Sequence, residues 1–139
     1  MVGLVVATHG NLAEELLRTA EGIVGRLEQC EALSVGGGAS MEDARARLGE
    51  AVHRVDAGEG VLVLTDMFGG TPSNLALTFL DEKLEVVTGV NLPMILKLAT
   101  ARAESLSLRA AAELIAAYGQ KNISLASELL RSRTQKPRP

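Results

Sequence analysis

The stretch VGLVVATHG, residues 2–10, decides the fold that we expect for this chain. Residues 2–7 form a nearly continuous apolar run, which is typical of a strand covered on both faces of a sheet. The run stops at Thr8-His9-Gly10, and a polar segment that favours a helix follows it. A buried strand of this kind delivers the imidazole of His9 to the end of the sheet. We therefore take His9 as the candidate reacting group.

Segments typical of strands and helices alternate along the rest of the chain. The run VLVLT at 61–65 is the clearest further strand, and shorter strands are predicted at 30–35 and 84–88. Apolar stripes at helical spacing predict the remaining elements, at residues 12–24, 41–55, 72–80, 94–101 and 108–118. The alternation predicts an α/β fold, a doubly wound and mostly parallel sheet in the order 2-1-3-4 with helices on both faces.

Polar residues at the expected helix starts indicate how these helices begin. We expect Asn11 to cap the first helix and Ser40, with Asp43 three residues on, to cap the second. Thr71 is the expected cap of the third helix, since Pro72 is favoured at the first helical position.

Size and composition indicate one globular domain with an aliphatic core. The 139 residues include two Phe, one Tyr and no Trp. The formal charge is −3, but residues 131–139 hold four positive charges, so residues 1–130 carry 10 − 17 = −7. This acidic body argues against nucleic acid as a partner. We expect residues 1–130 to form the single domain and residues 131–139 to be a disordered basic tail.

The cysteine count and the apolar runs bear on the compartment. Cys30 is the single cysteine, so no disulfide can form within the chain, which fits a reducing compartment. The first strand lacks the basic region of a signal peptide, and no apolar run approaches the roughly 20 residues that span a bilayer. We expect a cytoplasmic protein, with Cys30 as a small core residue and His53 on the surface of its helix.

The topology predicts where the chemistry lies. Ligands of open parallel sheets bind beyond the carboxyl ends of the strands, where the connections diverge. His9 follows the first strand and Asp66 follows the third, and these two strands are neighbours in the expected order. A carboxylate beside an imidazole fixes the tautomer and leaves the other ring nitrogen free as a nucleophile or base.

An anion site is expected beside this pair. Gly69 and Gly70 leave backbone N–H groups uncovered at the start of the third helix, and Thr71 and Ser73 add hydroxyl groups. We expect these four residues to bind phosphate, with Thr8 lining the same pocket. A nucleophilic imidazole that faces an anion site suits phosphoryl transfer to and from histidine.

Other chemistries fit the sequence less well. A zinc site needs three or four ligands, which the scattered His, Cys and Asp residues do not supply, and we expect neither a metal nor a cofactor. A hydrolase triad of His9, Asp66 and Ser73 is conceivable, but the chain has no GxSxG nucleophile motif.

Four segments together resemble the IIA domain of the mannose-family phosphoenolpyruvate-dependent sugar phosphotransferase system. They are ATHG (7–10), AEELLRTAEGIVG (13–25), DMFGGTPSN (66–74) and TGVNLPM (88–94), in the order and at the spacing of that family. The resemblance implies that His9 accepts a phosphoryl group from phosphorylated HPr and passes it to a IIB component. It also implies that Asp66 orients the imidazole.

The resemblance extends to the pocket and to the assembly. It implies that Thr71 lies near the phosphate, that Asn74 belongs to the pocket and that Phe68 forms an apolar wall. It further implies a homodimer in which a last antiparallel strand, here Lys121–Ala126, is exchanged between subunits. The membrane would be involved only indirectly, through a permease.

The chain as given stops at Pro139, without the linker and IIB domain of some relatives. Two alternatives therefore stay open. One is a regulatory module, in which a partner protein reads the phosphorylation state of His9. The other is the related IIA-like domain of dihydroxyacetone phosphorylation, which the THG and GGTPSN segments fit less well.

Overall fold

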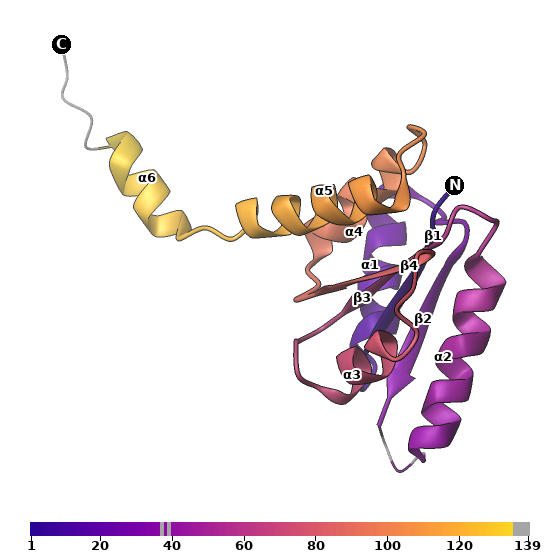
Figure 1. The fold of residues 1–139 in the computed structure, drawn as a ribbon. Coiled ribbons are helices and arrows are strands. Elements are labelled where there is room, and N and C mark those ends of the chain that lie inside the picture. Colours follow the sequence, from indigo (N-terminus) through magenta and orange to yellow (C-terminus); the bar gives the residue numbers. More distant parts are fainter. Residues whose placement is uncertain (37, 39, 135–139) are drawn as a thin grey trace.

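The structure is a computed structural model, and it describes residues 1–36, 38 and 40–134. Four parallel strands form one sheet in the order β2-β1-β3-β4, as predicted (Figure 1). The strands are β1 (Gly3–His9), β2 (Cys30–Val35), β3 (Val61–Thr65) and β4 (Leu84–Thr88). The helices are α1 (Leu12–Val24), α2 (Met41–Val55), α3 (Thr71–Leu77), α4 (Leu92–Ala101), α5 (Leu108–Lys121) and α6 (Ala126–Thr134).

The central strand β1 is buried because helices cover both faces of the sheet. Its residues alternate between two apolar cores, since successive side chains of a strand point to opposite faces. Leu4 and Val6 pack with residues of α1, α4 and α5. Val5 and Ala7 pack with residues of α2 and α3. The continuous apolar run of β1 is thus explained by burial on both faces of the sheet, as the sequence predicted.

The helix starts follow the predicted caps in part. The Ser40 hydroxyl accepts the N–H of Asp43 at 3.0 Å, as expected for α2. Asn11, in contrast, makes no side-chain capping bond to α1. The helix α3 begins at Thr71, with Gly70 in the N-cap position, so the prediction for Thr71 was one residue late. The end of α3 at Leu77 also precedes the predicted end at residue 80.

The C-terminal segment differs most from the prediction. The predicted strand Lys121–Ala126 is absent, because Lys121 ends α5 and Ala126 begins α6. A strand requires a neighbouring strand for its backbone hydrogen bonds, and this segment runs away from the body of the single chain (Figure 1). Residues 131–134, predicted as disordered, belong to α6, in which Glu128 and Arg131 pair at 3.5 Å. Residues 135–139 lie outside the described residues.

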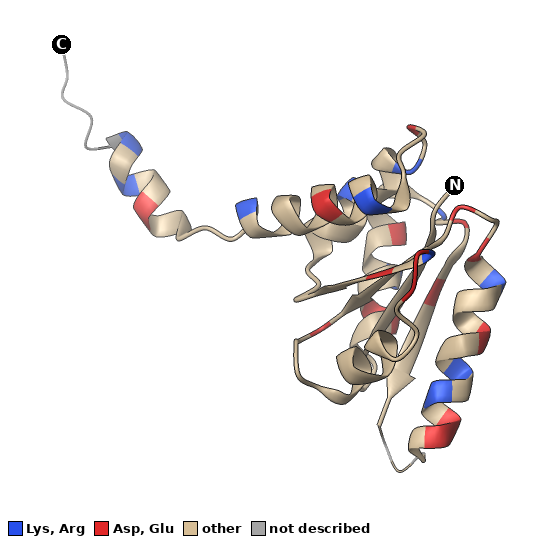
Figure 2. Cartoon of the chain, viewed as in Figure 1, with Lys and Arg blue, Asp and Glu red and all other residues tan. Residues whose placement is uncertain are grey.

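Charged residues of both signs are interspersed over the surface. Along α2, arginine residues are interspersed with Asp and Glu residues (Figure 2). His53 lies on the exposed side of α2, as predicted. Within the described part of the chain, no helix combines the length and the apolar character needed to cross a membrane.

Candidate active site

His9 and Asp66 lie side by side at the carboxyl edge of the sheet. β1 and β3 are adjacent, with Ala7 paired to Thr65, so the residues that follow are brought together. Nδ1 of His9 lies 2.8 Å from Oδ2 of Asp66. The same oxygen accepts the backbone N–H of His9 at 3.1 Å. The predicted pairing of these two residues is thus present in the structure.

The protonation of this pair follows from its surroundings. Burial of the Asp66 carboxyl disfavours its charge and by itself raises its pKa. The hydrogen bonds from the ring and backbone of His9, with the charge of the ring, outweigh burial, so the pKa of Asp66 lies below its ordinary value. An ionised carboxylate only accepts hydrogen bonds, so Nδ1 carries a proton in either charge state of the ring, and in the neutral ring Nε2 therefore presents its lone pair.

The His9 ring is half exposed and packs on the backbone of Gly70. The His9 side chain is 49% exposed, against 15% for Asp66. A Cβ atom at position 70 would lie 2.8 Å from Cε1 of His9 and 3.3 Å from Cγ of Met67. Any side chain at position 70 would therefore meet the imidazole. Gly69, with φ +84°, adopts a conformation that favours glycine and turns the loop toward α3.

Two predicted pocket residues are buried and have other roles. Ser73 is 0% exposed, and its hydroxyl lies 2.6 Å from the Thr65 hydroxyl and 2.5 Å from the Met67 carbonyl oxygen. Its position inside the first turn of α3 points it into the protein, so it does not bind phosphate in this conformation. The same burial removes it as the nucleophile of the alternative triad with His9 and Asp66.

Thr8 is the second of these residues. Its side chain is also 0% exposed. Thr8 Oγ1 accepts the N–H of Ala13 at 2.7 Å and donates to the carbonyl oxygen of His9 at 3.1 Å. It therefore caps α1 in place of Asn11 and does not line a pocket. The predicted strand ended at Ala7, but β1 continues to His9, and the alternation of side chains along β1 turns Thr8 inward with Leu4 and Val6.

Phe68 does not form the predicted pocket wall. Its side chain is 74% exposed and projects from the loop between β3 and α3. Met67, which the sequence did not single out, is 54% exposed in the same loop and contacts the His9 region through Gly70. Leu12, just after the His9 turn, is 47% exposed. Exposed apolar side chains thus occur in the loop that follows Asp66 and at the start of α1 after His9, and the exposed Asn74 lies on α3.

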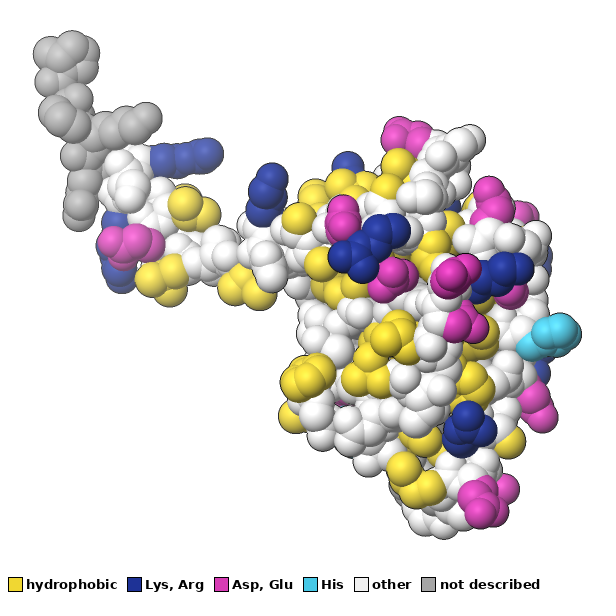
Figure 3. All heavy atoms as spheres, viewed as in Figure 1, with side chains coloured by type: hydrophobic (Ala, Val, Ile, Leu, Met, Phe, Trp, Pro, Cys, Tyr) yellow, Lys and Arg dark blue, Asp and Glu magenta, His cyan; other side chains and the backbone are white. Residues whose placement is uncertain are grey.

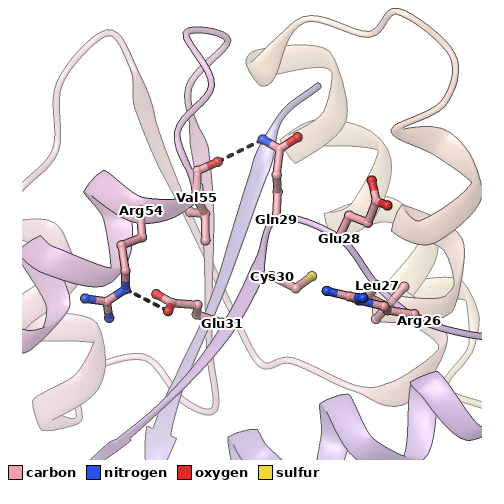
Figure 4. A pocket seen from close by; sticks show the side chains of 8 residues that line it. All are labelled: Arg26, Leu27, Glu28, Gln29, Cys30, Glu31, Arg54 and Val55. Carbon is pink, nitrogen blue, oxygen red and sulfur yellow. Dashed lines mark hydrogen bonds and ion pairs between the residues drawn. The ribbon is translucent and has the colours of Figure 1, made fainter.

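Two hollows of the protein surface lie away from His9. One, of about 440 Å³, lies at the opposite edge of the sheet (Figure 4). It is lined by Arg26, Leu27, Glu28, Gln29, Cys30, Glu31, Arg54 and Val55. Burial raises the pKa of the Cys30 thiol to about 11, more than nearby Arg102 lowers it, as fits the predicted core role. The other hollow, of about 220 Å³, lies between the end of β4 and α5.

The site has no obvious place for a metal among the described residues. Within them, no group of three or more His, Cys, Asp or Glu side chains is arranged to hold an ion. The fold and the site together define a class: a doubly wound α/β protein with a histidine–carboxylate pair at the point where the strand order reverses.

Comparison with known proteins narrows this class. A family model described as the PTS system fructose IIA component, EIIA-man, matches residues 3–116. Because the match spans most of the chain, the chain belongs to this family of IIA components. The resemblance inferred from the four sequence segments is thereby confirmed.

Individual relatives agree with this assignment. The PTS system mannose-specific EIIAB component of Escherichia coli K12 is 35% identical over 103 residues, which are 73% of this chain and 32% of that protein. The PTS system fructose-specific EIIA component of Bacillus subtilis 168 is 28% identical over 132 residues, or 94% of this chain and 90% of that protein. The two names are those of PTS system components, one mannose-specific and one fructose-specific, and neither favours the regulatory alternative.

The fold agrees with that of solved family members. The PTS IIA protein associated with the fucose utilization operon of Streptococcus pneumoniae superposes with a TM-score of 0.83 at 30% identity. The match covers 94% of this chain and 99% of that one. The α/β architecture with its parallel sheet is therefore that of PTS IIA components.

Proposed function

We propose that this protein is a phosphohistidine carrier that accepts a phosphoryl group on Nε2 of His9 and passes it on to a second protein. The observation that carries the proposal is the hydrogen bond between Nδ1 of His9 and Asp66, at 2.8 Å. It assigns the proton to Nδ1 and so leaves the lone pair of Nε2 for attack. The nitrogen–phosphorus bond of the donor breaks as the new bond at Nε2 forms, and the donor imidazole keeps the electron pair.

Asp66 would assist both the acceptance and the release of the group. A phosphoryl group on Nε2 leaves the protonated imidazole with a positive charge, which the adjacent carboxylate stabilises. The Asp66 side chain is only 15% exposed, so this attraction is screened less than it would be in water. The carboxylate also keeps the ring in one orientation through its second bond, to the His9 backbone N–H.

The loop that follows Asp66 would receive the phosphoryl oxygens. Gly69 and Gly70 have no side chains to cover their backbone, and Gly70 packs directly on the His9 ring. Thr71 begins α3 and is half-buried, and Asn74 is exposed one turn later. We assign the phosphate contacts to the Gly69–Gly70 backbone and the Thr71 hydroxyl, with Asn74 at the rim.

The proposed donor is phosphorylated HPr and the proposed acceptor is a IIB component. A partner must approach closely, because the two histidines share one phosphorus atom during transfer. The exposed apolar side chains of Leu12, Met67 and Phe68 beside His9 give such a partner an apolar contact. The compartment in which these proteins meet is proposed to be the cytoplasm, and a membrane permease would act only after IIB.

Phosphorylation in a reconstituted system tests this function. The protein is incubated with phosphoenolpyruvate, enzyme I and HPr, and incorporated phosphate is measured. We expect a label that is lost in acid and kept in alkali, as for phosphohistidine, and complete loss of that label in His9→Ala. His53→Ala is the matched control, since His53 is exposed on α2, and it should be labelled normally. Label that persists in His9→Ala would contradict the site.

We also propose a homodimer formed through residues 121–126. The segment and the following helix α6 expose four apolar side chains, Ile123, Leu125, Leu129 and Leu130, by 58% to 76% (Figure 3). Within the described residues, β4 pairs only with β3, so its outer edge can accept a further strand. The 220 Å³ hollow beside the end of β4 includes Ile123 in its lining.

The dimer is tested by the mass of the protein in solution. Ile123→Asp combined with Leu125→Asp places charge in the proposed interface and should yield monomers in size-exclusion chromatography with light scattering. The control Ile23→Asp alters a side chain that is 60% exposed on α1 and should leave the dimer intact. A monomeric wild-type protein, or a double variant that remains dimeric, would contradict the proposal.

A further inference from the structure

The two residues that follow His9, Gly10 and Asn11, make few side-chain contacts that could hold the turn. β1 ends at His9, and Gly10 then takes a left-handed backbone conformation with φ +53°. A Cβ atom at Gly10 would meet nothing within 4 Å, so this side of Gly10 faces open space. Asn11 makes no side-chain bond to the start of α1. The direction of the His9 backbone must therefore be fixed from elsewhere.

Hydroxyl groups of two adjacent strands hold this turn. Thr8 on β1 bonds the N–H of Ala13 and the carbonyl oxygen of His9. Ser34 on β2 is the register partner of Thr8, and its hydroxyl donates to the carbonyl oxygen of Gly10. The carbonyl oxygen of Ser34 in turn accepts a hydrogen bond from Arg47 of α2 at 3.3 Å. Ser34 thus links the His9 turn to β2 and, through Arg47, to α2.

We propose that Ser34 is a positioning residue for His9. Asp66 accepts the backbone N–H of His9 from the β3 side, and Ser34 holds the carbonyl group of the following residue, Gly10, from the β2 side. Glycine rotates more freely than other residues, so the Gly10 peptide needs a hydrogen bond to keep one orientation. With the peptide fixed, the ring stays at bonding distance from Asp66, and the Nδ1–H tautomer is maintained.

The kinetic part of this inference rests on the proposed function, whereas its spectroscopic part does not. In Ser34→Ala, the rate of phosphoryl uptake from phosphorylated HPr should fall roughly three- to tenfold, the loss expected from one hydrogen bond that orients the reacting group. In nitrogen-15 NMR spectra of the unphosphorylated protein, the His9 ring should shift from the pure Nδ1–H tautomer toward a mixture. Ser34→Thr keeps the hydroxyl and should restore both properties.

A matched control separates positioning from general destabilisation. Ser107 precedes α5, away from the His9 turn, and its hydroxyl accepts the N–H of Ala110. Ser107→Ala therefore also removes one hydrogen bond. It should leave the uptake rate and the His9 tautomer unchanged. Ser34→Ala with wild-type rate and tautomer would overturn the inference, as would equal losses in Ser107→Ala. If wild-type protein takes up no phosphate, the proposed function fails, and the tautomer measurement still decides the role of Ser34.

Discussion

One oxygen atom of Asp66, Oδ2, accepts two hydrogen bonds from His9, at 2.8 Å from the ring nitrogen Nδ1 and at 3.1 Å from the backbone N–H. The Asp66 carboxylate therefore fixes the His9 ring relative to the His9 backbone. The second oxygen, Oδ1, is buried and has no hydrogen-bond partner among the described residues. The geometry of the pair thus rests on a single bridging atom, and changes at that atom should affect both tautomer and orientation.

Asp66→Asn should slow phosphoryl transfer by about 10- to 100-fold. The amide has nearly the same size but loses the charge, and a hydrogen bond to a charged group contributes about 1.5–3 kcal/mol. Asparagine can also present its NH₂ group to Nδ1, which would favour the wrong tautomer. Rapid-quench measurement of uptake from phosphorylated HPr checks this expectation. A variant with wild-type rates would remove Asp66 from the mechanism.

The contribution of Asp66 to the stability of the fold should decrease as the pH falls. Its pKa in the folded protein lies below the ordinary value of 3.8, because hydrogen bonds from His9 outweigh the effect of burial. The stabilisation is therefore complete above the unfolded-state pKa and is lost as the pH falls through the lower folded-state pKa. Urea unfolding of wild type and Asp66→Asn should differ at about pH 5, and this difference should shrink progressively below pH 3.8. A difference that stays constant into strong acid would contradict the assignment.

Gly70→Ala should impair the site while the fold is retained. The added Cβ would lie 2.8 Å from Cε1 of His9, a distance that forces the ring or the loop to move. We expect transfer to slow at least tenfold, since small misplacements of a reacting group are costly. Gly22→Ala is the control, because a Cβ at Gly22 on α1 meets nothing within 4 Å. That variant should transfer phosphate normally and should be more stable by about 0.5–1 kcal/mol.

Arg102→Ala should destabilise the fold without altering the site. Arg102 is 8% exposed and donates to the carbonyl oxygens of Val2, Glu28 and Gln29, which joins the end of α4 to the starts of β1 and β2. Removing it breaks these buried hydrogen bonds, although the Gln29 carbonyl oxygen still accepts the N–H of Leu4. The loss should lower the free energy of unfolding by about 3 kcal/mol.

The exposed Arg109 provides the comparison for Arg102. Its ion pairs with Glu85 and Glu113 lie on the surface, so Arg109→Ala should lower the free energy of unfolding much less than Arg102→Ala does. Folded Arg102→Ala should be phosphorylated at the wild-type rate, since Arg102 lies at the edge of the sheet opposite to His9. If urea unfolding showed the same loss of stability in both variants, the buried hydrogen bonds of Arg102 would not contribute as we expect.

The sheet and the His9–Asp66 pair could be predicted from the sequence because both depend on local patterns. The apolar runs of β1 and β3 mark buried strands, and right-handed crossovers between parallel strands leave few possible strand orders. Once β1 and β3 are neighbours, the residues that follow them must meet at the same edge. The strand order alone was therefore enough to predict that His9 and Asp66 lie close together.

The direction of individual side chains could not be predicted in the same way. Ser73 was expected to bind phosphate and Thr8 to line the pocket, because both are polar and adjacent to the site in sequence. Both are fully buried, because strand alternation and the first turn of α3 point them inward. Phe68 was expected in the pocket from the family resemblance, yet its side chain is 74% exposed.

The sequence by itself determined the strand pattern, the placement of His9 and Asp66 and the membership of the family. Only the tertiary structure decided which hydroxyl groups serve the backbone, that Ser34 bonds the Gly10 carbonyl oxygen and that residues 126–134 form a helix. The physical reason is that strands and their order follow from short-range apolar periodicity. The partner of a hydroxyl group instead depends on atoms brought together from β1, β2 and β3, far apart in the chain.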